Sequence, residues 1–317
     1  MRTRQRSLTL LAVLSFVTMG ALAQDLTLPN KPGTLKFAVI GDSGTGDSNQ
    51  YRLAKVFSDM RRKFQYEFVI MAGDNMYGSQ KASDYTKKFE TPYKPILDEG
   101  IKFYAALGNH DQPNQANYKL FNMNGKRFYT FRPKAGVRFF ALDSNYMDKE
   151  QLDWLEKELA ASGSDWKIPF FHHPLYSSGS THGSDMALRD QLEPLFLKYS
   201  VDVVFSGHDH FYERIKPQKG IQYFVSGGAG KVRRGDLQDE GLMAKGFDAG
   251  YHFMLIEIDG DQMHFQVISD LGKTIDSGIV LRNKNQSRSE PSTAPSVNTV
   301  EKPIPAGAKP STATKKP

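Results

Sequence analysis

The sequence predicts a mixed α/β fold in which two β-sheets pack face to face and helices flank them. Three observations lead to this prediction. Five short apolar runs, each typical of a buried strand, are followed by a glycine or a polar residue. Amphipathic helical patterns lie between several of these runs, which favours parallel strand pairing. Residues 221–280, in contrast, contain a series of strand-like runs without helices.

The expected strands cover residues 35–40, 68–72, 103–107, 168–171 and 201–206. The first expected helix covers residues 49–63, where the apolar side chains share one face. Asp148 is the expected N-cap of a second helix that reaches Ala161. A third helix is expected over residues 188–198, weakened or kinked by Pro194.

The composition of the 317 residues is that of a globular protein, with 39% hydrophobic and 24% charged residues. It excludes a collagenous, wholly disordered or polytopic membrane protein. The absence of cysteine excludes thiolate metal sites, a thiol nucleophile and disulfides. Any metal must therefore be held by Asp, Asn, His, Tyr or Glu. No internal repeat divides residues 24–282, which we interpret as a single domain.

The N-terminus has the pattern of a secretory signal peptide. Three arginines precede an apolar run over residues 8–19, which is too short to span a bilayer comfortably. The run is followed by Ala21-Leu22-Ala23, a small-x-small cleavage pattern. We expect residues 1–23 to be removed, Gln24 to begin the mature chain, and the protein to be secreted or periplasmic without a stable membrane anchor. An uncleaved anchor is the alternative.

The C-terminal residues 283–317 consist mainly of Pro, Ser, Thr, Ala and Lys, a composition that predicts a disordered tail. The ends of the chain also explain its net charge of +6, because residues 1–23 contribute +3 and residues 283–317 contribute +4, which leaves −1 for residues 24–282. A nearly neutral domain does not carry the basic footprint of a nucleic-acid-binding protein. We expect no nucleic-acid partner and favour a monomer.

Ligand-type side chains follow all five expected strands. In open α/β sheets the chemistry gathers beyond the carboxyl ends of the strands. A single Gly-Asp pair is also a common turn, but five such endings with oxygen or imidazole donors indicate a metal centre. His208 and His210 alternate, so on an extended segment they face the same way. The predicted ligands are Asp42, Asp74, Asn109, His172, His208 and His210.

These motifs resemble those of the calcineurin-like metallophosphoesterases, and more narrowly the purple acid phosphatases of the tartrate-resistant acid phosphatase type. The resemblance covers about residues 35–280, and the motifs occur in the family's order. They are Asp42-x-Gly44, Gly73-Asp74-Asn75-Met76-Tyr77, Gly108-Asn109-His110-Asp111, His172 and Gly207-His208-Asp209-His210.

The narrower resemblance depends on two residues. Most of the superfamily has a metal-ligating His two residues after the first Asp, whereas this sequence has Gly44 there and supplies Tyr77 after Gly73-Asp74. A phenolate is a hard oxygen ligand that suits Fe(III). The resemblance therefore implies a dinuclear centre of Fe(III) plus a divalent Fe, Zn or Mn ion.

The resemblance also implies which residues bind each metal, with Asp74 as the bridging carboxylate. Metal 1 would be held by Asp42, Asp74, Tyr77 and His210, and metal 2 by Asp74, Asn109, His172 and His208. The ions would lie about 3.5–4 Å apart, and a metal-bound hydroxide would attack phosphorus in line.

The departing alcohol needs a proton, and the resemblance supports His110 and His182 as its donors. For His182, a solvent-facing loop residue is the alternative interpretation. Phe171-His172-His173-Pro174 offers two imidazoles. The family has one His followed by an aromatic residue and Pro, so we predict His172 as the ligand and His173 as the replacement of the aromatic residue.

The predicted function is that of a secreted phosphatase that hydrolyses small phosphomonoesters at this metal centre. Two alternatives remain open. The same metals could cleave phosphodiesters or nucleotide anhydrides, or the protein could be a secreted metalloprotein that binds phosphate without turnover.

Overall fold

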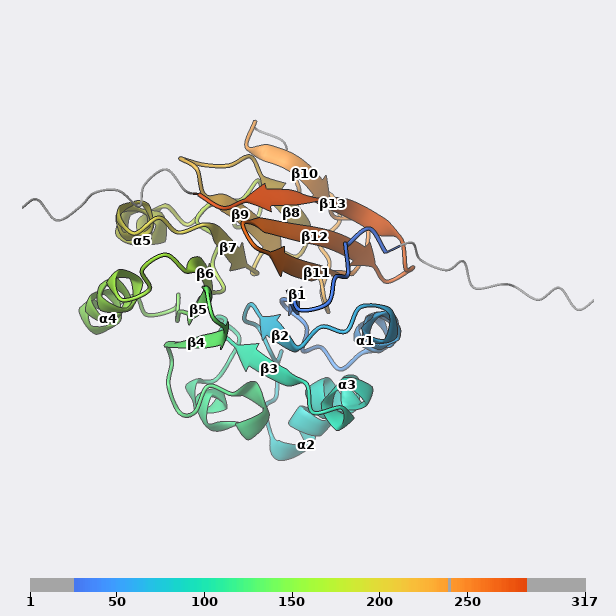
Figure 1. Cartoon of the computed structure of the whole chain (residues 1–317). Coiled ribbons are helices and arrows are strands. Elements are labelled where there is room, and N and C mark those ends of the chain that lie inside the picture. Colours follow the sequence, from blue (N-terminus) through green and yellow to red (C-terminus); the bar gives the residue numbers. More distant parts are fainter. Residues whose placement is uncertain (1–25, 239–240, 284–317) are drawn as a thin grey trace, which may run out of the picture. The chain divides into compact units, whose positions relative to one another are not determined.

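The computed structural model describes residues 26–238 and 241–283. The predicted signal peptide and, except for Asn283, the predicted tail lie outside these ranges. Figure 1 shows strands and helices that alternate through the first two thirds of the described chain and strands alone thereafter. No helix among the described residues is long and apolar enough to cross a bilayer.

The first sheet has six strands, of which the three that are first in sequence are parallel to one another. β11 pairs antiparallel with β1, and β12 and β13 extend the sheet antiparallel beyond it. In spatial order the strands are β13 (Thr274–Leu281), β12 (Gln262–Ser269), β11 (His252–Asp259), β1 (Leu35–Ile40), β2 (Phe68–Met71) and β3 (Lys102–Ala105).

The second sheet has seven strands, and it is also mixed. β5, β6, β7 and β9 run parallel, whereas β4, β8 and β10 pair antiparallel with their neighbours. In spatial order the strands are β10 (Met243–Phe247), β8 (Tyr212–Ile215), β9 (Gln222–Ser226), β7 (Val203–Ser206), β6 (Trp166–Phe170), β5 (Val137–Ala141) and β4 (Tyr129–Lys134).

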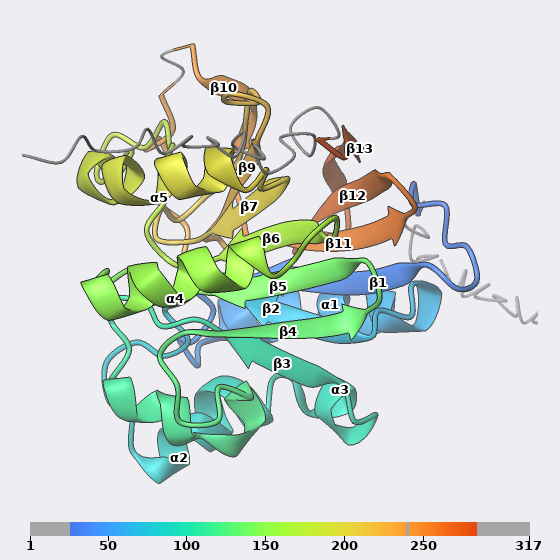
Figure 2. The ribbon, with the colours of Figure 1, turned by 60° about the vertical axis from the view of Figure 1, so that its left-hand side comes forward.

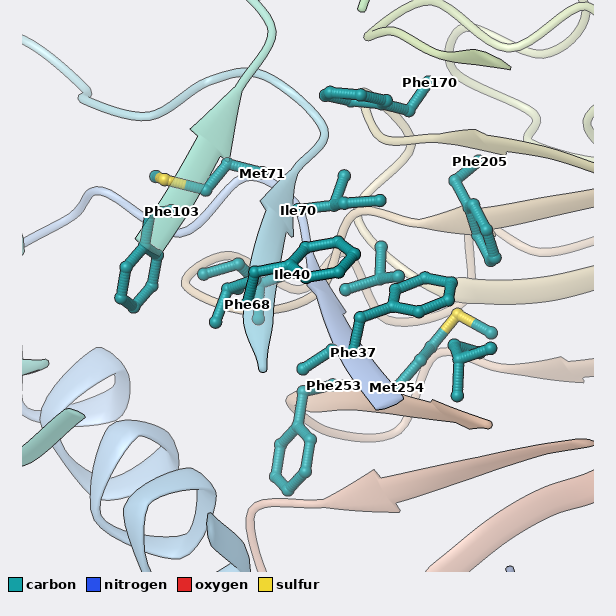
Figure 3. Packing of buried hydrophobic residues seen from close by; sticks show 14 of the residues in the cluster. Phe37, Ile40, Phe68, Ile70, Met71, Phe103, Phe170, Phe205, Phe253 and Met254 are labelled. Atoms are coloured by element: carbon teal, nitrogen blue, oxygen red, sulfur yellow. The ribbon is translucent and has the colours of Figure 1, made fainter. Parts of the chain in front are cut away.

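Buried side chains of both sheets form one core. The ring of Phe37 on β1 meets the ring of Phe139 on β5 edge to face, with 5.1 Å between the centroids. Phe224 on β9 contacts Phe265 on β12 in the same way, at 5.1 Å. Figure 3 shows Phe37 and Phe205 within this core. The predicted packing of two mixed sheets face to face is therefore confirmed.

The longer helices cover the outer faces of the sheets. α1 (Ser48–Lys63) contributes apolar side chains to the same cluster as β1 and β2. α4 (Lys149–Ala160) and α5 (Met186–Lys198) form a second cluster with residues such as Phe140 that face away from the main core. Figure 2 shows α4 and α5 beside the strands of the second sheet. The shorter helices are α2 (Ala82–Tyr85), the π-helix Thr86–Glu90, α3 (Lys94–Asp98), and the 3₁₀ turns Pro113–Asn117 and Lys119–Phe121.

The predicted elements are all present, with boundaries that shift by a few residues. Asp148 caps α4 as predicted, because its carboxylate accepts the backbone N–H of Gln151 at 2.9 Å. α5 starts earlier than predicted, where the carboxylate of Asp185 accepts the N–H of Leu188. Pro194 lies inside α5 and does not end it.

Candidate metal centre

The carboxyl ends of the parallel strands of both sheets bring the predicted ligands together. The backbone N–H of Asp42, after β1, donates to the carbonyl of Gly73 after β2, at 3.0 Å. The N–H of Gly207, after β7, donates to the carbonyl of His172 after β6, also at 3.0 Å. These bonds continue the strand pairing into the loops, so the polar residues that follow are fixed by the sheets.

One group of side chains corresponds to the predicted ligands of metal 1. The phenol of Tyr77 donates to Asp42 Oδ1 at 2.9 Å, and its oxygen lies 3.1 Å from His210 Nε2. Asp42 Oδ1 and His210 Nε2 are 3.5 Å apart. The donor atoms of Asp42, Asp74 and His210 all lie within 4.8 Å of one another, a spacing that one metal ion can span.

A second group corresponds to the predicted ligands of metal 2. Asn109 Oδ1 lies 3.0 Å from His172 Nε2 and 3.0 Å from His208 Nδ1, and the two ring nitrogens are 3.1 Å apart. Asp74 Oδ1 lies 3.4 Å from His172 Nε2. Asp74 therefore contacts this group as well as the first, which is the position that a bridging carboxylate requires.

The surroundings of His172 identify its ligand atom. Nδ1 lies 3.0 Å from the carbonyl oxygen of Ala72, which can only accept a hydrogen bond. Nδ1 must therefore carry the proton, and the unprotonated Nε2 faces the same point as Asn109 Oδ1 and His208 Nδ1, where its lone pair can bind a metal. A backbone carbonyl behind a metal-binding imidazole commonly fixes the ring in this way.

The electrostatics of the site fit a cation. Asp42 and Asp74 are both buried, and their carboxylates offer oxygen atoms within 4.8 Å of each other. Burial, and next the charge of Asp74, raise the pKa of Asp42 well above its usual value. Burial lowers the pKa of His208 to about 2 and that of His210 to about 4. Neutral imidazoles keep their lone pairs available for a metal, and a bound metal would compensate the negative charge of the buried carboxylates. The residues thus suit a dinuclear centre.

Three of the predicted ligands have an unusual backbone conformation. Asp42, Asp74 and His208 have φ values of 57°, 49° and 71°. Residues other than glycine seldom adopt positive φ, and such conformations often occur at functional sites. The glycines beside them allow close packing, since a Cβ atom at Gly108 would lie 2.2 Å from Asp74 Oδ1.

The two predicted proton donors lie at the rim of the centre, each beside a different group. His110 is exposed, its ring centroid is 4.9 Å from that of Tyr77, and its backbone N–H donates to Asp74 Oδ1 at 2.9 Å. His182 is also exposed, and its ring centroid is 4.2 Å from that of His208. A substrate that arrives from solvent can therefore reach both imidazoles.

His173 also lies beside the second group, where its donor atom is within 4.8 Å of those of His172 and His208. Its Nδ1 lies 2.8 Å from Ser144 Oγ, which also accepts the backbone N–H of His173 at 3.1 Å. A hydroxyl both donates and accepts, so it does not fix the tautomer as the carbonyl behind His172 does.

Sequence reasoning assigned no role to Asp111, although it belongs to a quoted motif. Its carboxylate accepts the backbone N–H groups of Gly108, Asn75 and Met76 at 2.9–3.0 Å, so it joins the loops that carry Asp74 and Asn109. Burial and the charge of Asp74 raise the pKa of Asp111 to about 7.

Sequence reasoning also missed Lys231, whose Nζ lies 3.8 Å from the Tyr77 ring centroid. Nothing in the local sequence pattern points to this contact.

The fold and site define a metal-dependent phosphoesterase, and comparison with known families agrees. The calcineurin-like phosphoesterase family matches residues 35–212, which include every predicted site residue. The chain belongs to this family.

Its relatives include purple acid phosphatases, as the motifs predicted. The chain is 28% identical to purple acid phosphatase 17 of Arabidopsis thaliana, over 74% of this chain and 80% of that protein. It is 24% identical to human tartrate-resistant acid phosphatase type 5, over 84% of this chain and 95% of that one. The purple acid phosphatase PPD1 of yellow lupin has a similar fold, with a TM-score of 0.67, 18% identity and coverage of 82% of this chain and 56% of that one.

Proposed function

We propose that the protein is a secreted or periplasmic acid phosphatase that hydrolyses small phosphomonoesters at a centre of Fe(III) and a divalent Fe, Zn or Mn ion. The observation that carries the proposal is the position of the Tyr77 phenol oxygen, 2.9 Å from Asp42 Oδ1 and 3.1 Å from His210 Nε2. A phenol among a carboxylate and an imidazole is a donor set suited to a hard trivalent cation.

When bound, the two metal ions supply the positive charge that activates the attacking water and attracts the phosphoryl oxygens. The protein's own contribution is to hold the donor atoms in place and to supply a proton. Asp74 lies where it can contact both ions. His182 or His110, both exposed at the rim, protonates the oxygen of the departing alcohol.

An assay of the metal-reconstituted protein with an aryl phosphomonoester and an aryl phosphodiester tests this proposal. We expect the monoester to react faster, with the optimum at mildly acidic pH. A faster diester would instead support the phosphodiesterase alternative. No turnover of either ester by protein with full metal content would support a phosphate-binding protein.

Export is a separate part of the proposal. The support for it is the pattern of residues 1–23 in the sequence, which lie outside the described residues. N-terminal sequencing of protein recovered outside the cytoplasm should give Gln24 as the first residue. Recovery of the full-length chain from the membrane fraction would contradict the proposed cleavage.

A further inference from the structure

His182 depends on its loop for its position. Within the described ranges, no hydrogen bond holds the imidazole itself, although its ring lies beside that of His208. We call residues 177–184 the acid loop, because they carry the proposed proton donor. Gly183 turns this loop with a φ of 72°. Whatever fixes the backbone on either side of His182 therefore also fixes the imidazole.

Asp236 holds the two residues that immediately precede His182. Its Oδ1 accepts the hydroxyl of Ser180 at 2.8 Å and the hydroxyl of Thr181. In addition, the backbone N–H of Ser180 donates to the carbonyl oxygen of Asp236 at 2.8 Å. Asp236 is only 3% exposed, so the acceptor of these partly buried bonds is shielded from water.

The segment that contains Asp236 also reaches the metal centre. The backbone N–H of Arg233 donates to the carbonyl of His210 at 3.1 Å, and its guanidinium lies 3.4 Å from Asp236 Oδ2. Burial acts to raise the pKa of Asp236, but the hydroxyls of Thr181 and Ser180 and the charge of Arg233 hold it below its usual value. The carboxylate is therefore ionised and accepts strong hydrogen bonds.

We propose that Asp236 is a positioning residue that holds His182 at the metal centre through Ser180 and Thr181. The inference rests on the proposed function, because it requires His182 to deliver a proton to the leaving group. Through Arg233 the same segment also contacts a predicted ligand of metal 1, so it ties the acid loop to the metals. Neither the motifs nor their spacing indicates this role, since Asp236 lies 54 residues after His182 in the sequence.

The test compares Asp236→Ala with the parent on two substrates. The leaving group of an aryl phosphate needs little protonation, whereas the leaving group of an alkyl phosphate must be protonated as it departs. We expect metal content to be unchanged. The rate should fall by about 10–100-fold on the alkyl ester, as for a catalytic group that is misplaced by about an ångström, and much less on the aryl ester. Asp270→Ala is the matched control, because Asp270 is likewise a carboxylate paired with an arginine, Arg52, at 2.6 Å, and among the described residues it forms no hydrogen bond or ion pair with the acid loop.

A double variant makes the test sharper. If Asp236 acts through His182, then Asp236→Ala combined with His182→Ala should be no slower on the alkyl ester than His182→Ala alone, because residues that act through each other are not additive. Additive losses, equal losses on both esters or a loss of metal would overturn the inference.

A milder pair of substitutions covers the case in which Asp236→Ala does not fold. Ser180→Ala with Thr181→Val removes the two hydroxyl donors and leaves the carboxylate with Arg233. The same dependence on the leaving group is expected, and its absence would contradict the inference. If the parent protein hydrolyses neither ester, the proposed function is refuted. If the parent is active but the variants lose activity equally on both esters, show additive losses or lose metal, only the role of Asp236 is refuted.

Discussion

The backbone N–H of Tyr77 donates to the carbonyl oxygen of Gly44 at 2.9 Å, so the two residues that distinguish this metal centre are hydrogen-bonded to each other. The loop that carries Tyr77 packs so closely here that a Cβ atom at Gly44 would lie 1.8 Å from the carbonyl oxygen of Asn75. A larger residue at position 44 would therefore displace the Tyr77 loop. The absence of a side chain at one position and the phenol at the other belong to one local arrangement.

The first prediction concerns Tyr77. If its phenolate binds Fe(III), the oxidised protein should be pink to purple through charge transfer from the phenolate to the iron. Tyr77→Phe should lose the visible absorption band. The measurement is a visible spectrum together with iron analysis. A colourless, active and iron-free parent would contradict the iron assignment while leaving the phosphoesterase family intact.

The second prediction concerns Asp74, which contacts both groups of ligands. Asp74→Asn removes a negative charge that both metals share. Substitution of residues that merely support ligands typically costs 10–100-fold in metal affinity or activity, so we expect a loss of more than about 100-fold here, and a larger one than for Asn109→Ala. Metal analysis measures the metal content of the two variants, and phosphatase assays measure their activity. Unchanged metal occupancy in Asp74→Asn would show that Asp74 is not the bridge.

The third prediction separates the adjacent imidazoles. His172→Ala should deplete metal 2, because the carbonyl of Ala72 directs Nε2 of His172 toward the site. His173→Ala should retain both metals, since we predict that it replaces the family's aromatic residue. Metal analysis of the two purified variants decides this. Depletion in His173→Ala alone would reverse the assignment.

The fourth prediction concerns pH. Burial, followed by the charges of Arg233 and Lys231, lowers the pKa of His210 to about 4. A protonated imidazole cannot bind a metal, so protons compete with metal 1 at His210 only as the pH falls through this pKa. We expect metal content to be retained from pH 7 to about 5 and to fall only below about pH 4, because protons must displace the bound metal from the imidazole. Dialysis at graded pH followed by metal analysis measures this, and loss between pH 6 and 7 would contradict it.

The fifth prediction concerns the C-terminal tail. Asn283 is bonded to the domain, because its backbone N–H donates to Asp202 Oδ1 at 3.0 Å. A chain that ends after Asn283 should keep full activity and change in unfolding free energy by less than about 0.5 kcal/mol, as is usual away from packed features. Thermal unfolding and the phosphatase assay check this. A loss of folding would show that residues beyond Asn283 pack on the domain.

The sequence alone determined where five of the strands and three of the helices lie along the chain, and the chemical types of the ligands. Apolar runs followed by Asp, Asn or His are local features, and parallel strands bring their carboxyl ends to one edge. It also determined the cap at Asp148, because capping depends on residues close in sequence.

Only the tertiary structure decided which atom of each imidazole faces the site and which polar residues support it. The Ala72 carbonyl lies 100 residues from His172, Asp111 reaches Asn75 across 36 residues, and Asp236 reaches Thr181 across 55 residues. The positive φ of Asp42, Asp74 and His208 likewise has no signature in sequence spacing. These contacts depend on how distant segments pack, and periodicity and spacing report only on neighbours along the chain.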